Sequence, residues 1–309
     1  MPKIINTTNL TKIYGQIHAV DNVSLSIKQG EIFGFIGLNG AGKTTTIRML
    51  LGMISPTSGK CYLKGQKVKP GNIKIWRDVG YIVETPYSYP ELTVKENLEI
   101  VRRLRNIEDK ACVDGIIKKL KLGEHASKKA KHLSLGNGQR LGIAKALIHK
   151  PKILILDEPI NGLDPAGIVE IRQMLLNLAK NSGVTIFISS HRLDEISKMA
   201  TKIAIIHDGK LIKEIDGKQL DIQLRRTLIL DGKDKNAMKT VLSKAGYKVH
   251  RRDIKDYPAL QIEDEYAVNN PDKIAQLLVN SDHPPTLLKV QVEDLEKYFL
   301  RTIKETGGR

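Results

Sequence analysis

Short apolar runs alternate with amphipathic stretches along the chain up to about residue 216. Continuous apolar runs predict buried parallel strands, and apolar residues three and four positions apart predict helices that cover a sheet. Thr93 marks one helix start, because Glu96 follows three positions later as in a capping box. The expected strands are Glu31–Ile36, Lys152–Asp157 and Thr185–Ile188, and the expected helices include Thr44–Leu51, Ala111–Leu122 and Gln139–His149. This region is therefore predicted to have an α/β fold with a mixed sheet.

Beyond about Asp216 the pattern changes to short alternating segments that are separated by helices. Gly246 and Pro271 fit a helix end and a helix start, respectively. The expected strands are Thr227–Leu230, Tyr247–His250, Ala259–Ile262 and Thr286–Val292, and the expected helices are Lys235–Ala245, Pro271–Asn280 and Glu293–Lys304. Without the last helix, this β-α-β-β-α-β order resembles a ferredoxin-like unit. We therefore expect residues 1–216 to form one domain and residues 217–309 a C-terminal α+β domain.

A glycine-rich segment joins the expected strand Glu31–Ile36 to the helix pattern after it. Residues 37–44 read Gly-Leu-Asn-Gly-Ala-Gly-Lys-Thr, a complete G-x-x-x-x-G-K-[ST] phosphate-binding loop. Its glycines let backbone N–H groups face phosphates, and the helix N-terminus favours an anion. We expect Lys43 to reach the β- and γ-phosphates and Thr44 to hold Mg²⁺. The residues expected around a nucleoside triphosphate are Gly37, Asn39, Gly40, Ala41, Gly42, Lys43, Thr44 and Thr45.

Two adjacent carboxylates stand at the end of the expected strand Lys152–Asp157. Asp157 is placed to reach Mg²⁺, and Glu158 is placed to orient or deprotonate an attacking water. His191 follows another apolar strand, after Ser189 and Ser190. These residues predict hydrolysis of the bound triphosphate rather than binding alone.

The order of motifs resembles that of an ABC-type ATPase from residue 3 to residue 215. Leu133-Ser-Leu-Gly-Asn-Gly-Gln-Arg140 fits the L-S-x-G-x-x-Q-R signature, and Asn161-Gly-Leu-Asp-Pro165 fits the D-loop. The resemblance implies a catalytic base at Glu158, a γ-phosphate switch at His191 and stacking of Tyr14 on adenine. It also implies a small helical subdomain at about residues 86–135.

The same resemblance implies a head-to-tail pair of ATPase subunits, with ATP between one phosphate loop and the partner's signature. Ser134 and Gly136 then contact the nucleotide of the other subunit, and the expected nucleotide contacts extend to Gln139 and Asp164. A second reading of Ser134 is a plain helix cap. In either case Ser134 stands before a helix whose N-terminus offers a positive end to a phosphate.

One set of motifs, with no long coiled-coil insertion between Lys43 and Asp157, resembles the ATP-binding subunit of a transporter with a separate polytopic membrane subunit. Most cassettes place a glutamine after the segment Val79–Val83, whereas this chain has Glu84. Glu84 is an expected Mg²⁺ ligand. Val83-Glu-Thr-Pro-Tyr87, together with the signature and D-loop, looks like the bacitracin-resistance and lantibiotic-immunity branch of bacterial exporters. Asn137 and Gly138 depart from that branch.

Two groups of apolar side chains have more than one reading. Trp76, Tyr87 and Tyr89 can pack a local core or contact a coupling helix of the membrane subunit. The stripe of Leu295, Tyr298, Phe299 and Ile303 in the last helix can pack on this chain or on a partner.

Composition narrows the function only slightly. The chain has 309 residues and a formal net charge of +16 from scattered lysines, which suits solvated surfaces, anionic lipid or nucleic acid. No segment resembles a signal peptide or a membrane span, and Cys61 and Cys112 form no metal pattern. We expect an ATPase at the cytoplasmic face of the membrane, held there by the membrane subunit, with no nucleic-acid partner. The alternative is a soluble non-transport ATPase that acts on nucleic acid or the ribosome.

Overall fold

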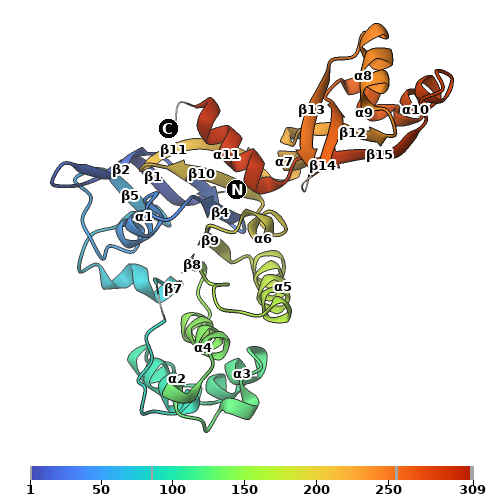
Figure 1. Cartoon of the computed structure of the whole chain (residues 1–309). Helices are drawn as coiled ribbons and strands as arrows, with labels where there is room; N and C mark the ends of the chain where they lie inside the picture. Colours follow the sequence, from blue (N-terminus) through green and yellow to red (C-terminus); the bar gives the residue numbers. More distant parts are fainter. Residues whose placement is uncertain (1, 85, 255–256, 307–309) are drawn as a thin grey trace. The chain divides into compact units, whose positions relative to one another are not determined.

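The computed structural model describes residues 2–84, 86–254 and 257–306 (Figure 1). The chain forms two compact units, Met1–Lys218 with Thr302–Arg309, and Gln219–Arg301. The second unit therefore begins close to the boundary expected at residue 217, but the chain returns to the first unit at Thr302. Thr85, within the quoted Val83–Tyr87 segment, lies outside the described residues.

A six-stranded mixed sheet forms the centre of the first unit. Its strand order is β11-β10-β4-β9-β8-β7, and β11 alone pairs antiparallel to its neighbour. The strands are β4 (Ile32–Ile36), β7 (Val79–Ile82), β8 (Ile153–Asp157), β9 (Thr185–Ser190), β10 (Lys202–His207) and β11 (Lys210–Asp216). Every residue of β4, β8 and β9 is buried, which confirms the strands expected from continuous apolar runs.

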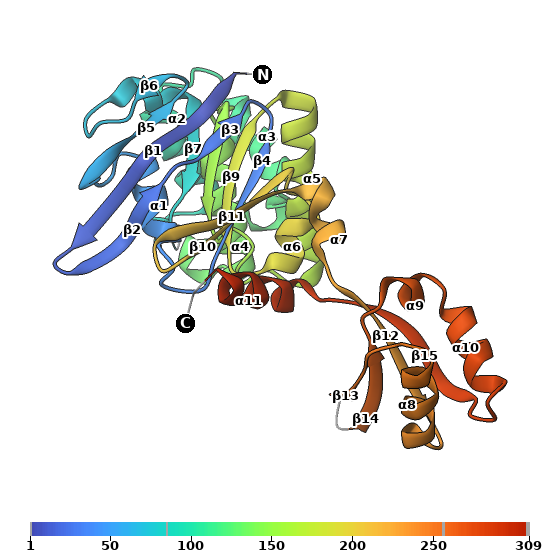
Figure 2. The same ribbon diagram turned by 90° about the horizontal axis from the view of Figure 1, so that it is seen from above.

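A second, five-stranded antiparallel sheet lies on one side of the first unit, and the sequence patterns did not predict it. Its strands are β1 (Lys3–Tyr14), β2 (Ile17–Val23), β3 (Ser26–Lys28), β5 (Ser58–Leu63) and β6 (Gln66–Lys67). Helix α1 (Lys43–Leu50) contributes Ile47, Met49 and Leu50 to one core that contains residues of both sheets. Figure 2 shows α1 beside β2 of the antiparallel sheet. The helix that follows the glycine-rich loop is thus fixed by packing on both sides.

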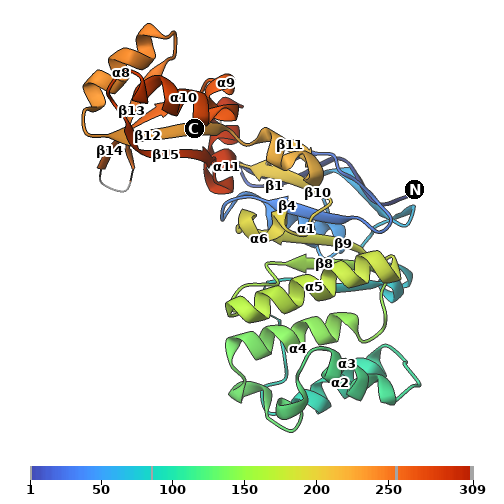
Figure 3. The same ribbon diagram turned by 90° about the vertical axis from the view of Figure 1, so that its right-hand side faces the viewer.

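The other face of the six-stranded sheet carries α5 (Pro165–Ser182) and α6 (Leu193–Ser197). The helical subdomain consists of α2 (Val94–Leu104), α3 (Ala111–Lys119) and α4 (Leu135–Leu147), with short 3₁₀ turns at Gly123–His125 and Ala130–His132. Figure 3 shows α4 between α5 and the α2–α3 pair. A further 3₁₀ turn, Ile73–Asp78, precedes β7.

Two helix starts test the sequence patterns directly. The capping box at Thr93 is confirmed, because Thr93 Oγ1 accepts from Glu96 N and the Glu96 carboxylate accepts from Thr93 N. The start of α4 expected at Gln139 is wrong, since the helix begins at Leu135 with Ser134 as its N-cap. Both signature glycines therefore lie inside the first turns of α4, where glycine weakens the helical pattern.

The second unit is built on a four-stranded antiparallel sheet in the order β13-β14-β12-β15. Its strands are β12 (Arg226–Gly232), β13 (Val249–Ile254), β14 (Tyr257–Ile262) and β15 (Pro285–Val292). Its helices are α7 (Leu220–Gln223), α8 (Lys235–Lys244), α9 (Glu265–Asn269) and α10 (Pro271–Val279), preceded by a 3₁₀ turn at Gly217–Gln219. Leu228, Leu230, Met238, Leu242 and Ile274 share its core. The short α9 was not expected.

The last helix, α11 (Leu295–Glu305), carries the expected apolar stripe. Tyr298, Phe299 and Ile303 are buried and Leu295 is partly buried, and whether a partner contacts the stripe stays a prediction. Among the aromatic residues near the helical subdomain, Trp76 packs against the core and the edge of Tyr81, whereas Tyr87 is 71% exposed. Within the described part of the chain, no helix is both long and apolar enough to cross a bilayer.

Candidate nucleotide-binding site

The glycine-rich loop connects β4 to α1 through backbone conformations that need glycine. Gly40 and Gly42 have φ values of 82° and 101°, which lie in the left-handed region. A Cβ atom on Gly42 would come within 2.4 Å of the Ala19 carbonyl oxygen, and one on Gly37 within 2.5 Å of the Ile206 oxygen. The loop therefore packs closely against the surrounding strands, and its last backbone N–H groups lie at the start of α1.

The Lys43 side chain folds back into the curve of the loop. Its ammonium Nζ donates to the carbonyl oxygens of Gly37 at 2.7 Å and Leu38 at 3.2 Å, and only 6% of the residue is exposed. The same atom lies 3.5 Å from Glu158 Oε1. One buried cation thus stands between the loop and the carboxylate at the end of β8.

A chain of oxygen atoms joins α1 to the ends of β8 and β9. The Thr44 hydroxyl donates to Asp157 Oδ2 at 2.7 Å, and the Ser189 hydroxyl donates to Asp157 Oδ1. Asp157 and Ser189 are almost completely buried. Ser189 was not among the site residues expected from the sequence. Its position at the end of a buried strand was the available signal.

Glu158 has an unusual backbone and a partly accessible carboxylate. Its φ is 48°, and its N–H donates to the carbonyl oxygen and hydroxyl of Ser189, both at 3.2 Å. Its Oε2 atom lies 3.0 Å from His191 Nδ1, and the two side chains are 20% and 42% exposed. The carboxylate therefore lies between Lys43 and His191 and is partly accessible to solvent. An accessible carboxylate beside an imidazole can accept and hold a proton.

Other expected contacts of the nucleotide border this group. Asn39 and Gly40 are exposed at the loop, Ala41 is buried and Thr45 is partly buried on α1. Tyr14, at the end of β1, is 48% exposed, and the Lys12 ammonium lies 5.0 Å from its ring centroid. An exposed aromatic face is available for stacking, and that role stays a prediction.

Glu84 pairs with α1 rather than with the oxygen atoms around Thr44. The Arg48 guanidinium donates to Glu84 Oε1 at 2.6 Å, and the two side chains are 38% and 59% exposed. Glu84 also has a positive φ of 56°. Arg48 was not singled out from the sequence, because nothing in its local pattern indicates a partner at position 84. The metal-binding role of Glu84 stays a prediction.

The signature and D-loop residues occupy the starts of two helices. Ser134 caps α4 and accepts from Asn137 N at 3.3 Å, so the plain-cap reading describes its contact in this chain. Asp164 caps α5 and accepts from Gly167 N at 3.1 Å. Gln139 is buried within α4, whereas Gly136 approaches the D-loop, where a Cβ atom would lie 3.4 Å from the Gly162 oxygen. Their contact with a second subunit stays a prediction.

Comparison with known proteins places this geometry in a family. Residues 20–161 match the family model described as ABC transporter. The bacitracin transport ATP-binding protein BcrA of Bacillus licheniformis is 41% identical over 303 residues, which cover 98% of each chain. The lantibiotic transport ATP-binding protein SrtF of Streptococcus pyogenes is 39% identical over 218 residues, 70% of this chain and 93% of that protein.

Solved structures agree with the sequence comparison. A dimeric post-hydrolysis state of an ATP-binding cassette bound to ADP and Pi is 26% identical and superposes with a TM-score of 0.65. The superposition covers 69% of this chain and 98% of that chain. These similarities do not favour a non-transport ATPase that acts on nucleic acid or the ribosome.

Proposed function

The chain belongs to the ABC transporter family of ATP-hydrolysing subunits, and we propose that it drives export of a peptide antibiotic through a separate membrane subunit. The observation that carries this proposal is the match to the bacitracin transport protein over 98% of both chains, which includes the second unit. Bacitracin or a lantibiotic is the proposed cargo class. The protein then acts as a peripheral subunit at the cytoplasmic face of the membrane.

The proposed hydrolytic step uses the side chains at the ends of β8 and β9. Lys43 exchanges its loop carbonyl contacts for the β- and γ-phosphates, which offer stronger charge-assisted bonds. Glu158 accepts a proton from the attacking water, and His191 orients the Glu158 carboxylate and contacts the γ-phosphate. Lys43 Nζ lies 3.5 Å from Glu158 Oε1, so the cation that binds the phosphates also stands beside the proposed base.

The oxygen atoms of Thr44 and Asp157 fit a magnesium ion. Magnesium prefers oxygen ligands and is commonly held by few protein groups together with phosphates and water. Thr44 Oγ1 and Asp157 Oδ2 are 2.7 Å apart, and no set of three or more His, Cys, Asp or Glu residues competes as a metal site in the described chain. Bound Mg²⁺ neutralises charge that develops on the phosphates. Ser189 holds Asp157 in position, and Glu84 is a proposed additional ligand.

Two copies of the chain are proposed to bind ATP in a head-to-tail arrangement. Ser134 and Gly136 begin α4, whose first amides offer a positive helix end to the partner's nucleotide. Asp164 caps α5 and Gln139 is buried within α4, and both are proposed to complete the contacts around the nucleotide. The proposed dimer agrees with the dimeric cassette structure that the first unit resembles.

A groove of about 520 Å³ on the first unit is the proposed contact for the membrane subunit. Its lining includes Arg48, Glu84, Tyr87, Leu104 and Lys145. Tyr87 and Leu104 are 71% and 75% exposed, which is unusual for large apolar side chains and suits a docking helix. The ion pair between Arg48 and Glu84 connects this groove to α1 and the phosphate loop.

The second unit is proposed to be a ferredoxin-like accessory domain, with the boundaries 1–216 and 217–309 as the working division of the chain. Its β-α-β-β-α-β order and its antiparallel sheet support that description. No expected catalytic residue lies in it, so we propose a role in assembly rather than in hydrolysis.

Expression of the chain with the membrane protein encoded beside it, in a bacitracin-sensitive bacterium, tests the proposed function. The measurement is the minimal inhibitory concentration of bacitracin and of a lantibiotic. We expect the pair to raise one of them, and the pair that carries Glu158→Gln to leave both at the level of the empty host. Equal protection by the parent and by Glu158→Gln would contradict coupling of resistance to hydrolysis.

A further inference from the structure

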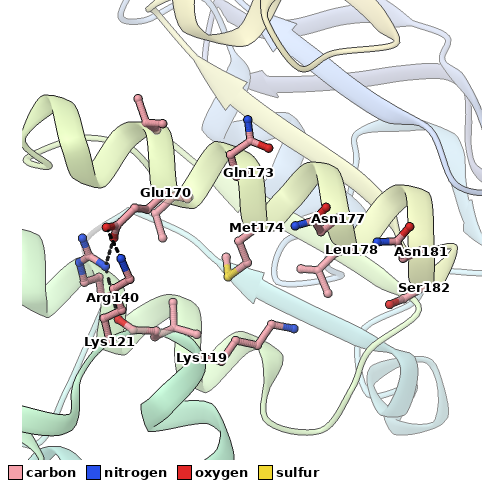
Figure 4. Close-up of a pocket in the computed structure, with 13 residues that line it drawn as sticks. Lys119, Lys121, Arg140, Glu170, Gln173, Met174, Asn177, Leu178, Asn181 and Ser182 are labelled. Carbon is pink, nitrogen blue, oxygen red and sulfur yellow. Dashed lines mark hydrogen bonds and ion pairs between the residues drawn. The ribbon is translucent and has the colours of Figure 1, made fainter.

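A polar cluster beside the proposed site joins the signature helix to the helix that follows the D-loop. Figure 4 shows Glu170 of α5 facing Lys121 and Arg140 at one end of a cavity. Lys121 Nζ donates to Glu170 Oε1 at 2.5 Å, and Arg140 Nη1 forms an ion pair with Glu170 Oε2 at 2.9 Å. Glu170 therefore forms ion pairs with two cationic side chains of the helical subdomain.

The Arg140 side chain is the more buried of the two cationic side chains. Its side chain is 14% exposed, compared with 68% for Lys121. A Cβ atom on Gly167, at the start of α5, would lie 3.3 Å from Arg140 Nη2. A guanidinium with so little access to water depends on its carboxylate partner, because an unpaired charge at such a site is costly.

The seam between α5 and the helical subdomain is open next to this cluster. A cavity of about 520 Å³ extends along α5 from Glu170 past Met174 to Asn181 and Ser182 (Figure 4). Apolar packing along this length of the seam is therefore incomplete.

Lys121 first, and then Arg140, hold the pKa of Glu170 below its usual value, so that the carboxylate is ionised and paired at neutral pH.

The start of α4 has a second contact with the D-loop segment. A Cβ atom on Gly162 would come within 2.3 Å of Leu135 Cδ2, which places Leu135 directly over this glycine. Leu135 contacts Gly162 ahead of α5, and Arg140 contacts Glu170 within α5. Two attachments one or two turns apart fix both the position and the direction of a helix.

We propose that Glu170 is a positioning residue that, through Arg140, holds the signature helix and the D-loop helix of one subunit as a single body. Ser134 and Asp164 cap the two helices that this body contains. Both motifs then meet the second subunit in a fixed relative orientation. This inference rests on the proposed head-to-tail dimer, because the orientation of α4 affects a nucleotide only in the other subunit.

The test uses the full chain with Glu158→Gln, which we expect to retain ATP. Two quantities are measured: binding of a fluorescent ATP analogue to the monomer, and the protein concentration at which ATP drives dimerisation in sedimentation velocity. We expect Glu170→Gln to leave nucleotide affinity within about twofold and to raise that concentration about tenfold, the order expected when a charged partner is lost. Arg140→Lys should act in the same direction, because lysine lacks the forked guanidinium.

Asp114→Asn is the matched control, since it removes an ion pair with Lys95 that lies within the helical subdomain. It should leave dimerisation at the parent value. If Glu170→Gln does not fold, Glu170→Asp and Arg140→Lys carry the same comparison. The double variant Arg140→Gln with Glu170→Gln should be no worse than Arg140→Gln alone, because the two residues act as one unit.

Parent-like dimerisation by both Glu170→Gln and Arg140→Lys would overturn the inference. The inference would also be overturned if the effects of Arg140→Gln and Glu170→Gln on dimerisation were additive in the double variant. An effect of Asp114→Asn on dimerisation as large as that of Glu170→Gln would overturn it as well. Failure of the Glu158→Gln parent itself to dimerise with ATP would instead contradict the proposed head-to-tail pair. The two failures are thus distinguishable.

Discussion

The Thr44 hydroxyl donates a 2.7 Å hydrogen bond to Asp157 Oδ2, across 113 positions of the chain. This bond joins the first turn of α1 to the last residue of β8, so the phosphate loop and the strand end share one oxygen cluster. Ser189 donates to the second oxygen of the same carboxylate. The proposed metal site therefore draws its oxygen atoms from the first turn of α1 and from the ends of two neighbouring parallel strands.

Asp157→Asn should raise the Mg²⁺ concentration needed for half-maximal ATPase activity by about tenfold to a hundredfold. An amide keeps the shape of the side chain but removes the charge that a divalent cation needs. Magnesium titrations at saturating ATP measure this effect. Ser189→Ala is the control and should give a smaller shift, because it removes only a donor to Asp157. An unchanged magnesium requirement in Asp157→Asn would exclude Asp157 from the metal site.

Glu158→Gln should lower turnover by about 10²-fold or more and preserve ATP binding, as expected when a general base is removed. Steady-state phosphate release and equilibrium nucleotide binding measure the two quantities. Because ATP then persists, a dimer should become visible by size-exclusion chromatography with ATP but not with ADP. Near-normal turnover would move the role of base away from Glu158.

Glu84→Ala should reduce resistance more than it reduces ATP affinity, because Glu84 lines the proposed docking groove and pairs with Arg48 on α1. Glu84→Gln should be milder, since it keeps an oxygen ligand and can still accept from Arg48. Resistance and nucleotide binding are measured on the same variants. Resistance equal to that of the parent in both variants would make Glu84 a bystander.

Tyr14→Ala should raise the Michaelis constant for ATP more than it lowers turnover. Tyr14 offers an exposed ring at the end of β1, and stacking adds contact area at little entropic cost. Tyr14→Phe is the matched control and should behave like the parent, because the ring face remains. Stacking does not distinguish purines, so GTP should also be hydrolysed. An unchanged Michaelis constant in Tyr14→Ala would remove Tyr14 from the nucleotide site.

His149 should make the protein less stable in mild acid. Burial first, and then the charge of Arg105, lowers the pKa of His149 from 6.5 to about 4. Between pH 6.5 and about 4, His149 is therefore protonated in the unfolded chain but neutral in the folded chain. The contribution of neutral His149 to the free energy of unfolding is complete above pH 6.5 and is lost as the pH falls toward 4. Urea unfolding at pH 7.5 and pH 5 measures the loss.

His149→Gln should lose less stability than the parent between these two pH values. The exposed His132→Gln is the control and should behave like the parent. An identical pH dependence for the parent and His149→Gln would contradict this assignment. Glutamine is chosen to replace His149 because His149 Nε2 lies 3.0 Å from the Val79 carbonyl oxygen. The amide side chain of glutamine can still donate a hydrogen bond to that oxygen.

The buried strands and the phosphate loop were predictable because their signals are local. Strands β4 and β8 are apolar on both faces, and the loop glycines are required by backbone geometry. The antiparallel sheet was missed because β1 has register shifts near Leu10 and polar residues along its length, which interrupt its alternation. The start of α4 was misplaced because Gly136 and Gly138 lie in its first turns.

The pairs that complete the site could not be predicted from one sequence. Arg48 and Glu84 are 36 positions apart and meet only in the folded chain. Arg140 and Glu170 likewise meet only after α4 and α5 are placed. Charged residues occur on all the described helices, so their partners follow from tertiary structure rather than from residue type.

The positive φ of Glu158 has a consequence for how the protein can be changed. Non-glycine residues in the left-handed region carry a cost that the surrounding fold must sustain. Replacement of Glu158 by glycine would relax the backbone and remove the base in one step. At this position, relief of backbone strain and turnover are therefore opposed, because the residue whose removal would relax the chain is the proposed base.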